Sequence, residues 1–260
     1  MYTLSWSFKE TNLVIKCDDK RAIDAAINAS LQARREIERL IIARPEFRWS
    51  IEPMRFKGEY PRVIELMLRA AEIADVGPFA AVAGSISQIS AEAAHEAGAK
   101  NVLVENGGDI AIIGDREFRV GIYAGGAGTS EKIGFLVRRE NLPIGICTSS
   151  GTVGHSVSLG HADAVVAVAS EASIADAAAT SIANAVRGAD IESSIERGLD
   201  RGHDIPEIQG CLIAREGHIG TSGKLPELIQ VSPEAEEISV VSKRYEGYGL
   251  ELATILQKNP

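Results

Sequence analysis

The sequence has few cysteines and no concentrated positive charge. Three cysteines, Cys17, Cys147 and Cys211, are an odd number and include no CxxC pair, which argues against a disulfide framework and against a zinc ribbon. Lys and Arg number 27 against 36 Asp and Glu, a net charge of -9. No block of basic residues interleaves with aromatic residues, so DNA and RNA are not expected partners.

Long apolar segments and targeting signals are lacking as well. The amino terminus reads MYTLSWSFKETNLVIK, without a charged start followed by an apolar core, and no later segment is long and apolar enough to span a bilayer. We therefore expect a cytoplasmic protein with no membrane partner. At 260 residues, 45% hydrophobic and 24% charged, the chain is typical of one folded domain over 1–260 or of two related lobes, and a homodimer is the expected assembly.

Apolar spacing predicts an α+β fold with an antiparallel sheet core and packed helices. A hairpin is expected around the turn at 10–12. Helical spacing predicts helices over 20–43, 63–74, 87–97, 173–186 and 191–199. Short apolar or alternating runs predict strands at 102–104, 110–113, 118–122, 133–137, 144–147 and 162–169, with a closing hairpin over 208–220.

Two loops at strand ends could hold a ligand. In Asn106-Gly107-Gly108-Asp109, paired glycines let the backbone approach a ligand while the amide and carboxylate supply hydrogen bonds. A hairpin turn with positive φ explains the same residues. Thr148-Ser149-Ser150-Gly151, with the following threonine, crowds four hydroxyls beside one glycine, a composition that suits either a phosphate cradle or a plain polar loop.

One helical segment carries a candidate cation site. Asp176 and Thr180 are four residues apart, so their oxygens share a helix face and could bind Mg²⁺. The alternative is a capping box, in which Ser173 and Asp176 satisfy the first N–H groups of their own helix.

A histidine-containing segment is the remaining candidate. His155, His161 and Asp163 lie close in sequence, which suggests proton transfer or an additional ligand contact. Their spacing matches no established metal-ligand pattern, so a polar loop is the alternative.

In this order along the chain, the segments resemble the ApbE family of FAD-dependent flavin transferases, which attach FMN to a threonine of partner proteins. Gly84-Ser85-Ile86-Ser87-Gln88 resembles the family's GGIAK-type segment, and Asn106–Asp109 its NxGGD junction. Thr148–Gly151 resembles its TSG loop, and Asp176-x3-Thr180 its DxxxT helix. The resemblance covers about residues 83–184. It implies that Asp176 and Thr180 bind Mg²⁺ with the Ser87 carbonyl, that Gly84, Ser85 and the two loops hold the cofactor, and that the fold has two related halves.

The chain also departs from the family pattern. Gln88 stands where the family usually has lysine, and no DPxTG element precedes residues 164–169; His155, His161 and Asp163 occupy that place. The resemblance therefore implies Mg²⁺ more firmly than FAD, and it is closest to a cytoplasmic branch of ApbE-like proteins. Two functions follow: a Mg²⁺-dependent transferase acting on a flavin or another phosphate-bearing molecule with a protein acceptor, or a non-catalytic accessory protein with a suggested link to sulfur assimilation in anaerobes.

Overall fold

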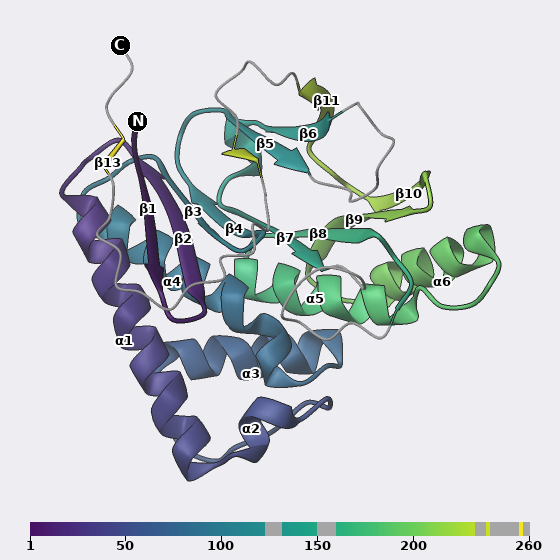
Figure 1. Cartoon of the computed structure of the whole chain (residues 1–260), viewed down its shortest axis with the longest axis horizontal. Coiled ribbons are helices and arrows are strands. Elements are labelled where there is room, and N and C mark those ends of the chain that lie inside the picture. Colours follow the sequence, from purple (N-terminus) through teal and green to yellow (C-terminus); the bar gives the residue numbers. More distant parts are fainter. Residues whose placement is uncertain (123–131, 150–159, 232–237, 240–254, 257–260) are drawn as a thin grey trace.

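The fold is α+β, as the sequence predicts. The structure is a computed structural model, and it describes residues 1–122, 132–149, 160–231, 238–239 and 255–256 (Figure 1). Among these residues, no helix has both the length and the apolar character needed to cross a bilayer.

A nine-stranded sheet forms the centre of the molecule, in the order β10-β9-β8-β7-β4-β3-β2-β1-β13. Every neighbouring pair in it is antiparallel. Its strands are β1 Tyr2–Phe8, β2 Thr11–Cys17, β3 Val102–Asn106, β4 Asp109–Ile113, β7 Ile144–Ser149, β8 Ala164–Ala169, β9 Ile208–Arg215, β10 His218–Gly223 and β13 Ile255–Leu256. Strand β8, an interior strand of this sheet, reads AVVAVA and is buried along its whole length, because both faces of the sheet are covered there.

A second sheet covers one face of the central strands. Its order is β11-β6-β5-β12, with β5 Phe118–Ile122, β6 Lys132–Val137, β11 Glu227–Val231 and β12 Ile238–Ser239. Phe118 and Phe135 of this sheet share an apolar core with Leu103, Ile110 and Ile146 of the main sheet. The sequence predicts β5 and β6 correctly as strands, but they pair outside the main sheet.

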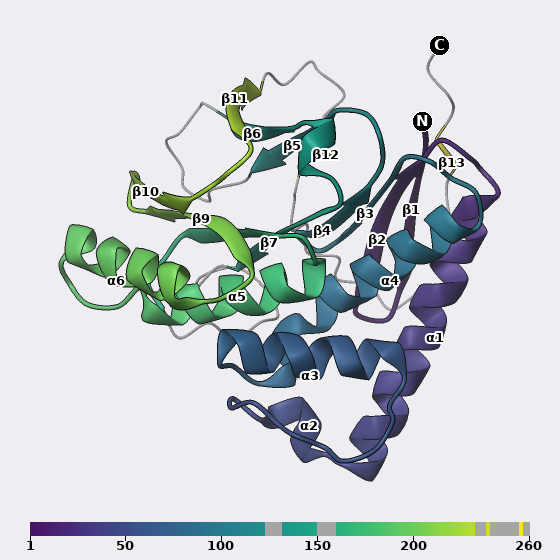
Figure 2. The ribbon, with the colours of Figure 1, turned by 180° about the vertical axis from the view of Figure 1, so that it is seen from behind.

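Helices cover the opposite face of the main sheet (Figures 1 and 2). They are α1 Ala22–Ala43, α2 Glu46–Trp49, α3 Arg62–Ala74, α4 Val82–Glu96, α5 Ala172–Ala185 and α6 Ile191–Asp204, with short 3-10 turns at Pro78–Ala81 and Arg139–Asn141. The predicted helix start at Ser87 is wrong, because α4 begins at Val82. Residues 84–88 therefore lie inside a helix.

Glycine allows α4 and α5 to approach each other closely. A Cβ built on Gly84 would lie 2.3 Å from the Ala172 carbonyl oxygen, a distance that no side chain could occupy without displacing the backbone. This contact brings the first turns of the two helices together over β4 and β7.

Candidate functional site

The β3–β4 hairpin closes with a tight turn whose two end residues are buried. Gly107 and Gly108 have φ angles of +66° and +109°, so the hairpin-turn interpretation of these glycines is confirmed. Asn106 and Asp109 pair across the turn and are 6% and 7% exposed. The Asn106 Oδ1 atom accepts a hydrogen bond from the Asn12 N–H at 3.2 Å, which fixes the hairpin against β2.

Asp109 is held by bonds from both neighbouring elements. Its Oδ1 atom accepts from the Thr148 N–H at 3.3 Å, and the Ser87 hydroxyl donates to its backbone carbonyl at 2.8 Å. The buried Cys147 thiol, which lies beside Asp109, donates to the Ala172 carbonyl oxygen at 3.2 Å. The Asp109 carboxyl therefore points toward the helices.

Asp176 caps a neighbouring helix and not its own. Its Oδ2 atom accepts from the Gly84 N–H at 2.8 Å, and the Ala83 N–H is a second donor. Both N–H groups belong to the first turn of α4, which has no intrahelical acceptor for them. The capping-box interpretation is wrong, because α5 begins at Ala172 and Asp176 lies in its second turn.

In the opposite direction, the Gln88 side chain of α4 caps the first turn of α5. Its Oε1 atom accepts from the Ser173 N–H at 3.2 Å and from the Ser173 hydroxyl at 3.1 Å. Helices α4 and α5 thus satisfy each other's first turns through one carboxylate and one amide. We did not predict this role of Gln88 from the sequence, because the two partners are 85 residues apart.

The pKa values of both carboxyls are raised in the folded protein. Burial raises the pKa of Asp176 to about 7, against the bonds from Gly84 and Ala83 that lower it. Burial and then the Asp176 charge raise the pKa of Asp109 well above its usual range. In the described part of the chain neither carboxyl forms a salt bridge with Lys or Arg, so each negative charge is poorly compensated.

Glu105, which is 5% exposed, adds a third carboxyl on the opposite face of the sheet. Burial raises its pKa to about 7, and the Lys16 charge partly offsets this. Glu105 also contributes to the raised pKa of Asp109. The region around the β3–β4 hairpin is therefore strongly acidic.

The residues present fit a hard divalent cation, which prefers oxygen ligands. Thr180 is 7% exposed and lies one helical turn after Asp176. The hydroxyls of Ser85 and Ser149 are buried without a hydrogen-bond partner among the described residues. Because those residues contain no group of three or more His, Cys, Asp and Glu suited to a metal, a cation here would need hydroxyl or carbonyl oxygens beside the two carboxylates.

The other predicted site residues are placed as follows. Ser87 lies inside α4, where a backbone carbonyl normally accepts the helix's own hydrogen bond, and its hydroxyl bonds Asp109. The Asp163 carboxylate accepts from the Glu216 N–H at 2.6 Å, and exposed His161 lies 3.5 Å from the Gly188 carbonyl. These bonds tie both residues to the turns near 188 and 216 and not to Asp109 or Asp176. His155, Ser150 and Gly151 lie outside the described residues.

Sequence comparisons match most of this chain to known proteins. A family model described as "AbpE bacteria" matches residues 2–207. A UPF0280 protein from Methanococcus aeolicus is 42% identical over 90% of this chain and 95% of its own length. A UPF0280 protein from Methanocaldococcus jannaschii is 42% identical over 85% of this chain and 91% of its own.

Two solved structures share the fold at low identity. The flavin transferase ApbE from Vibrio cholerae has a TM-score of 0.53 at 13% identity, covering 85% of this chain and 96% of that one. The flavinyl transferase ApbE from Pseudomonas stutzeri, in its apo form, has a TM-score of 0.53 at 12% identity, covering 85% and 95%. At these identities the likeness concerns the fold alone.

Proposed function

From the premise that this chain belongs to the AbpE family and is a relative of the UPF0280 proteins, we propose that it binds a divalent cation together with a phosphate-bearing small molecule. A flavin nucleotide is the first candidate for that molecule, because the solved proteins of the same fold are named flavin transferases. The proposed site is the cluster around Asp109 and Asp176.

The observation that carries the proposal is the pair Asp109 and Asp176. Their negative charges have no salt-bridge partner among the described residues. Two neighbouring carboxyls with raised pKa values are costly when both are ionised. A divalent cation would neutralise them, with Asp109, Asp176 and Thr180 as the residues that hold it. When bound, Mg²⁺ would supply positive charge to the phosphate oxygens of the ligand.

The chain's own residues would fix the positions of the two carboxylates that hold the cation. The Gly84 N–H fixes one oxygen of Asp176, and the Thr148 N–H fixes one oxygen of Asp109. Among the described residues, no atom lies within 4 Å of a Cβ built on Gly107, so the described part of the chain leaves space at the hairpin tip beside Asp109. A ligand could approach the hairpin backbone there.

A non-catalytic accessory role is the second candidate, and Gln88 is the observation that favours it. This residue stands where the resembling family usually has lysine, and both ends of its amide are engaged within the chain. It therefore offers a ligand neither a positive charge nor a free donor. A protein with this substitution could retain binding while lacking transfer chemistry.

One experiment separates these roles. The full chain is incubated with FAD and Mg²⁺, and then with a threonine-containing acceptor peptide. Calorimetry measures binding, and mass spectrometry measures FMN transfer and FAD hydrolysis. Transfer or hydrolysis that is lost in Asp176→Asn supports the enzyme, and Mg²⁺-dependent binding without turnover supports the accessory protein.

The matched control is Asp200→Asn, because Asp200 is an exposed aspartate on α6. This variant should behave as the unmodified chain does. The proposal fails if neither FAD nor Mg²⁺ binds at millimolar concentration, or if the two variants bind Mg²⁺ equally well.

A further inference from the structure

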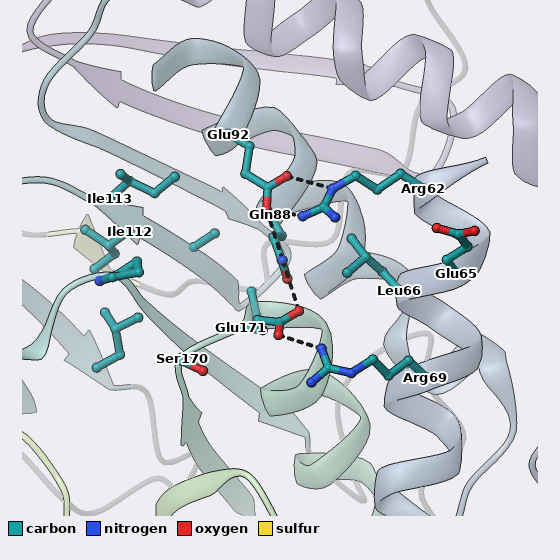
Figure 3. Close-up of a pocket in the computed structure, with 14 residues that line it drawn as sticks. Arg62, Glu65, Leu66, Arg69, Gln88, Glu92, Ile112, Ile113, Ser170 and Glu171 are labelled. Atoms are coloured by element: carbon teal, nitrogen blue, oxygen red, sulfur yellow. Dashed lines mark hydrogen bonds and ion pairs between the residues drawn. The ribbon is translucent and has the colours of Figure 1, made fainter. Parts of the chain in front are cut away.

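A cavity of about 460 Å³ opens between α3, α4 and the ends of two strands (Figure 3). Its lining includes Ile113 at the end of β4 and Ile144 at the start of β7. Asp109 lies at the other end of β4, four residues and therefore about 13 Å away along the strand. Neither Asp109 nor Asp176 lines the cavity, although Ala111, two residues from Asp109, does.

Part of its wall is apolar. Ile112, Ile113, Pro143 and Ile144 line it from the sheet side, and Leu66 of α3 reaches in from the opposite side. A wall of this kind favours an apolar body on the ligand, because covering it removes apolar surface from water.

The other part of the wall is a chain of charged groups that bind one another. Arg62 donates through Nε and Nη2 to Glu92 at 3.0 and 2.8 Å. Gln88 donates to Glu92 at 3.1 Å and to Glu171 at 3.4 Å, and Arg69 donates through Nη1 to Glu171 at 2.6 Å. The hydrogen bonds of the described residues leave Arg62 Nη1 and Arg69 Nε as donors for a ligand.

Glu65 supplies the complementary acceptor. It lies three residues after Arg62 and four before Arg69 on α3, so the three side chains share one helix face. Its carboxylate is exposed and forms no hydrogen bond or salt bridge among the described residues. Figure 3 shows all three side chains projecting from α3, with the guanidinium groups of Arg62 and Arg69 reaching toward Glu92 and Glu171 and the Glu65 carboxylate lying nearer the helix.

We infer that this cavity binds a small zwitterion with an apolar body, of the size of an amino acid with an aliphatic side chain. The ammonium group meets Glu65, the carboxylate takes the remaining N–H groups of Arg62 and Arg69, and the aliphatic part covers Leu66 and Ile113. A ligand with carboxylate alone fits less well, because the lining carries three glutamates against two arginines. A ligand with ammonium alone leaves the guanidinium donors unused.

Three probes that differ by one charged group test this inference. L-leucine carries both charges, 4-methylpentanoate lacks the ammonium, and 3-methylbutylamine lacks the carboxylate. Calorimetry on the full chain should give the tightest binding for leucine, with each half-molecule weaker by about threefold or more, the range of exposed ion pairs. Glu65→Gln should weaken leucine binding to the level of 4-methylpentanoate and should not weaken 4-methylpentanoate binding, because it removes a negative charge from the lining.

Glu72→Gln is the matched control, because Glu72 lies on α3 outside the cavity lining and pairs with Arg55. It should bind leucine as the unmodified chain does. The inference is overturned if none of the three probes binds at up to 50 mM, if 4-methylpentanoate binds as tightly as leucine, or if the two variants lose the same affinity. Because Asp109 and Asp176 are untouched in both variants, Mg²⁺ binding measured alongside reports on the proposed function separately.

Discussion

Replacing Asp176 by asparagine should make the cation-free protein more stable at neutral and alkaline pH. Asparagine keeps an oxygen that can accept from the Gly84 N–H but carries no charge. The pKa of Asp176 is raised from 3.8 to about 7 in the folded protein, so the folded state holds a proton that the unfolded state releases. Stability is therefore greatest at low pH and is lost as the pH rises from about 4 to about 7.

The size of the effect follows from that shift. About three pKa units at about 1.4 kcal/mol each give an upper bound near 4 kcal/mol. Because Asp109 titrates together with Asp176, the gain on removing one charge is on the order of 2 to 4 kcal/mol. It should be close to its full size at pH 8 and much smaller at pH 4.5.

Urea unfolding at pH 4.5 and pH 8, with a chelator present, measures the gain. Asp176→Ala separates charge from capping, because alanine also leaves the Gly84 N–H without its acceptor and should be about 1 kcal/mol less stable than Asp176→Asn at both pH values. Asp200→Asn, on the exposed surface of α6, should change little. The reasoning is refuted if Asp176→Asn is no more stable than the unmodified chain at pH 8, or if its gain is the same at both pH values.

Four further predictions concern this pair of helices and the β3–β4 hairpin beside it. Mg²⁺ should raise the melting temperature of the unmodified chain at pH 8 and not at pH 5, where the carboxyls hold protons, as thermal shift measurements at both pH values would show. Gln88→Ala should lower the free energy of unfolding, measured in urea, by about 1 to 3 kcal/mol, because the Ser173 N–H and hydroxyl lose their acceptor. Gly84→Ala should lower the same quantity by about 2 kcal/mol or more, because its Cβ would lie 2.3 Å from a carbonyl oxygen. Gly107→Ala, strained by its φ of +66° and with no described atom within 4 Å of the added Cβ, should cost about 1 kcal/mol.

Local periodicity predicts most helices and strands but not their pairing. The alternation in β2 and the apolar stripe of α3 are properties of short segments, and both elements form where the pattern indicates. Strands β5 and β6 have the same short apolar character as β3 and β4, yet they pair with β11 and β12. Which sheet a strand joins depends on partners about a hundred residues away, and a segment's own pattern carries no such information.

The sequence predicts which residues belong to the site but not which of them contact one another. The order of the motifs suggests that Gly84, Asp109 and Asp176 meet, and the structure brings these three together; their role as ligands stays a prediction. The sequence offers no signal for Gln88 as a cap of α5. The capping-box rule also fails, because it needs Ser173 just before the helix and the residue is instead the second in α5.

Asp176 has one negative charge and two roles. It accepts the Gly84 N–H at the start of α4, and it is a proposed ligand of the cation. The ionised carboxylate is the better acceptor for the Gly84 N–H, yet ionisation beside Asp109 is what burial opposes. A cation and the Asp176→Asn substitution would relieve the same repulsion, so their stabilising effects cannot add. If Mg²⁺ at pH 8 stabilised Asp176→Asn as much as it stabilises the unmodified chain, the cation would have to bind elsewhere, and the carboxylate pair would be a structural feature of the helix contact alone.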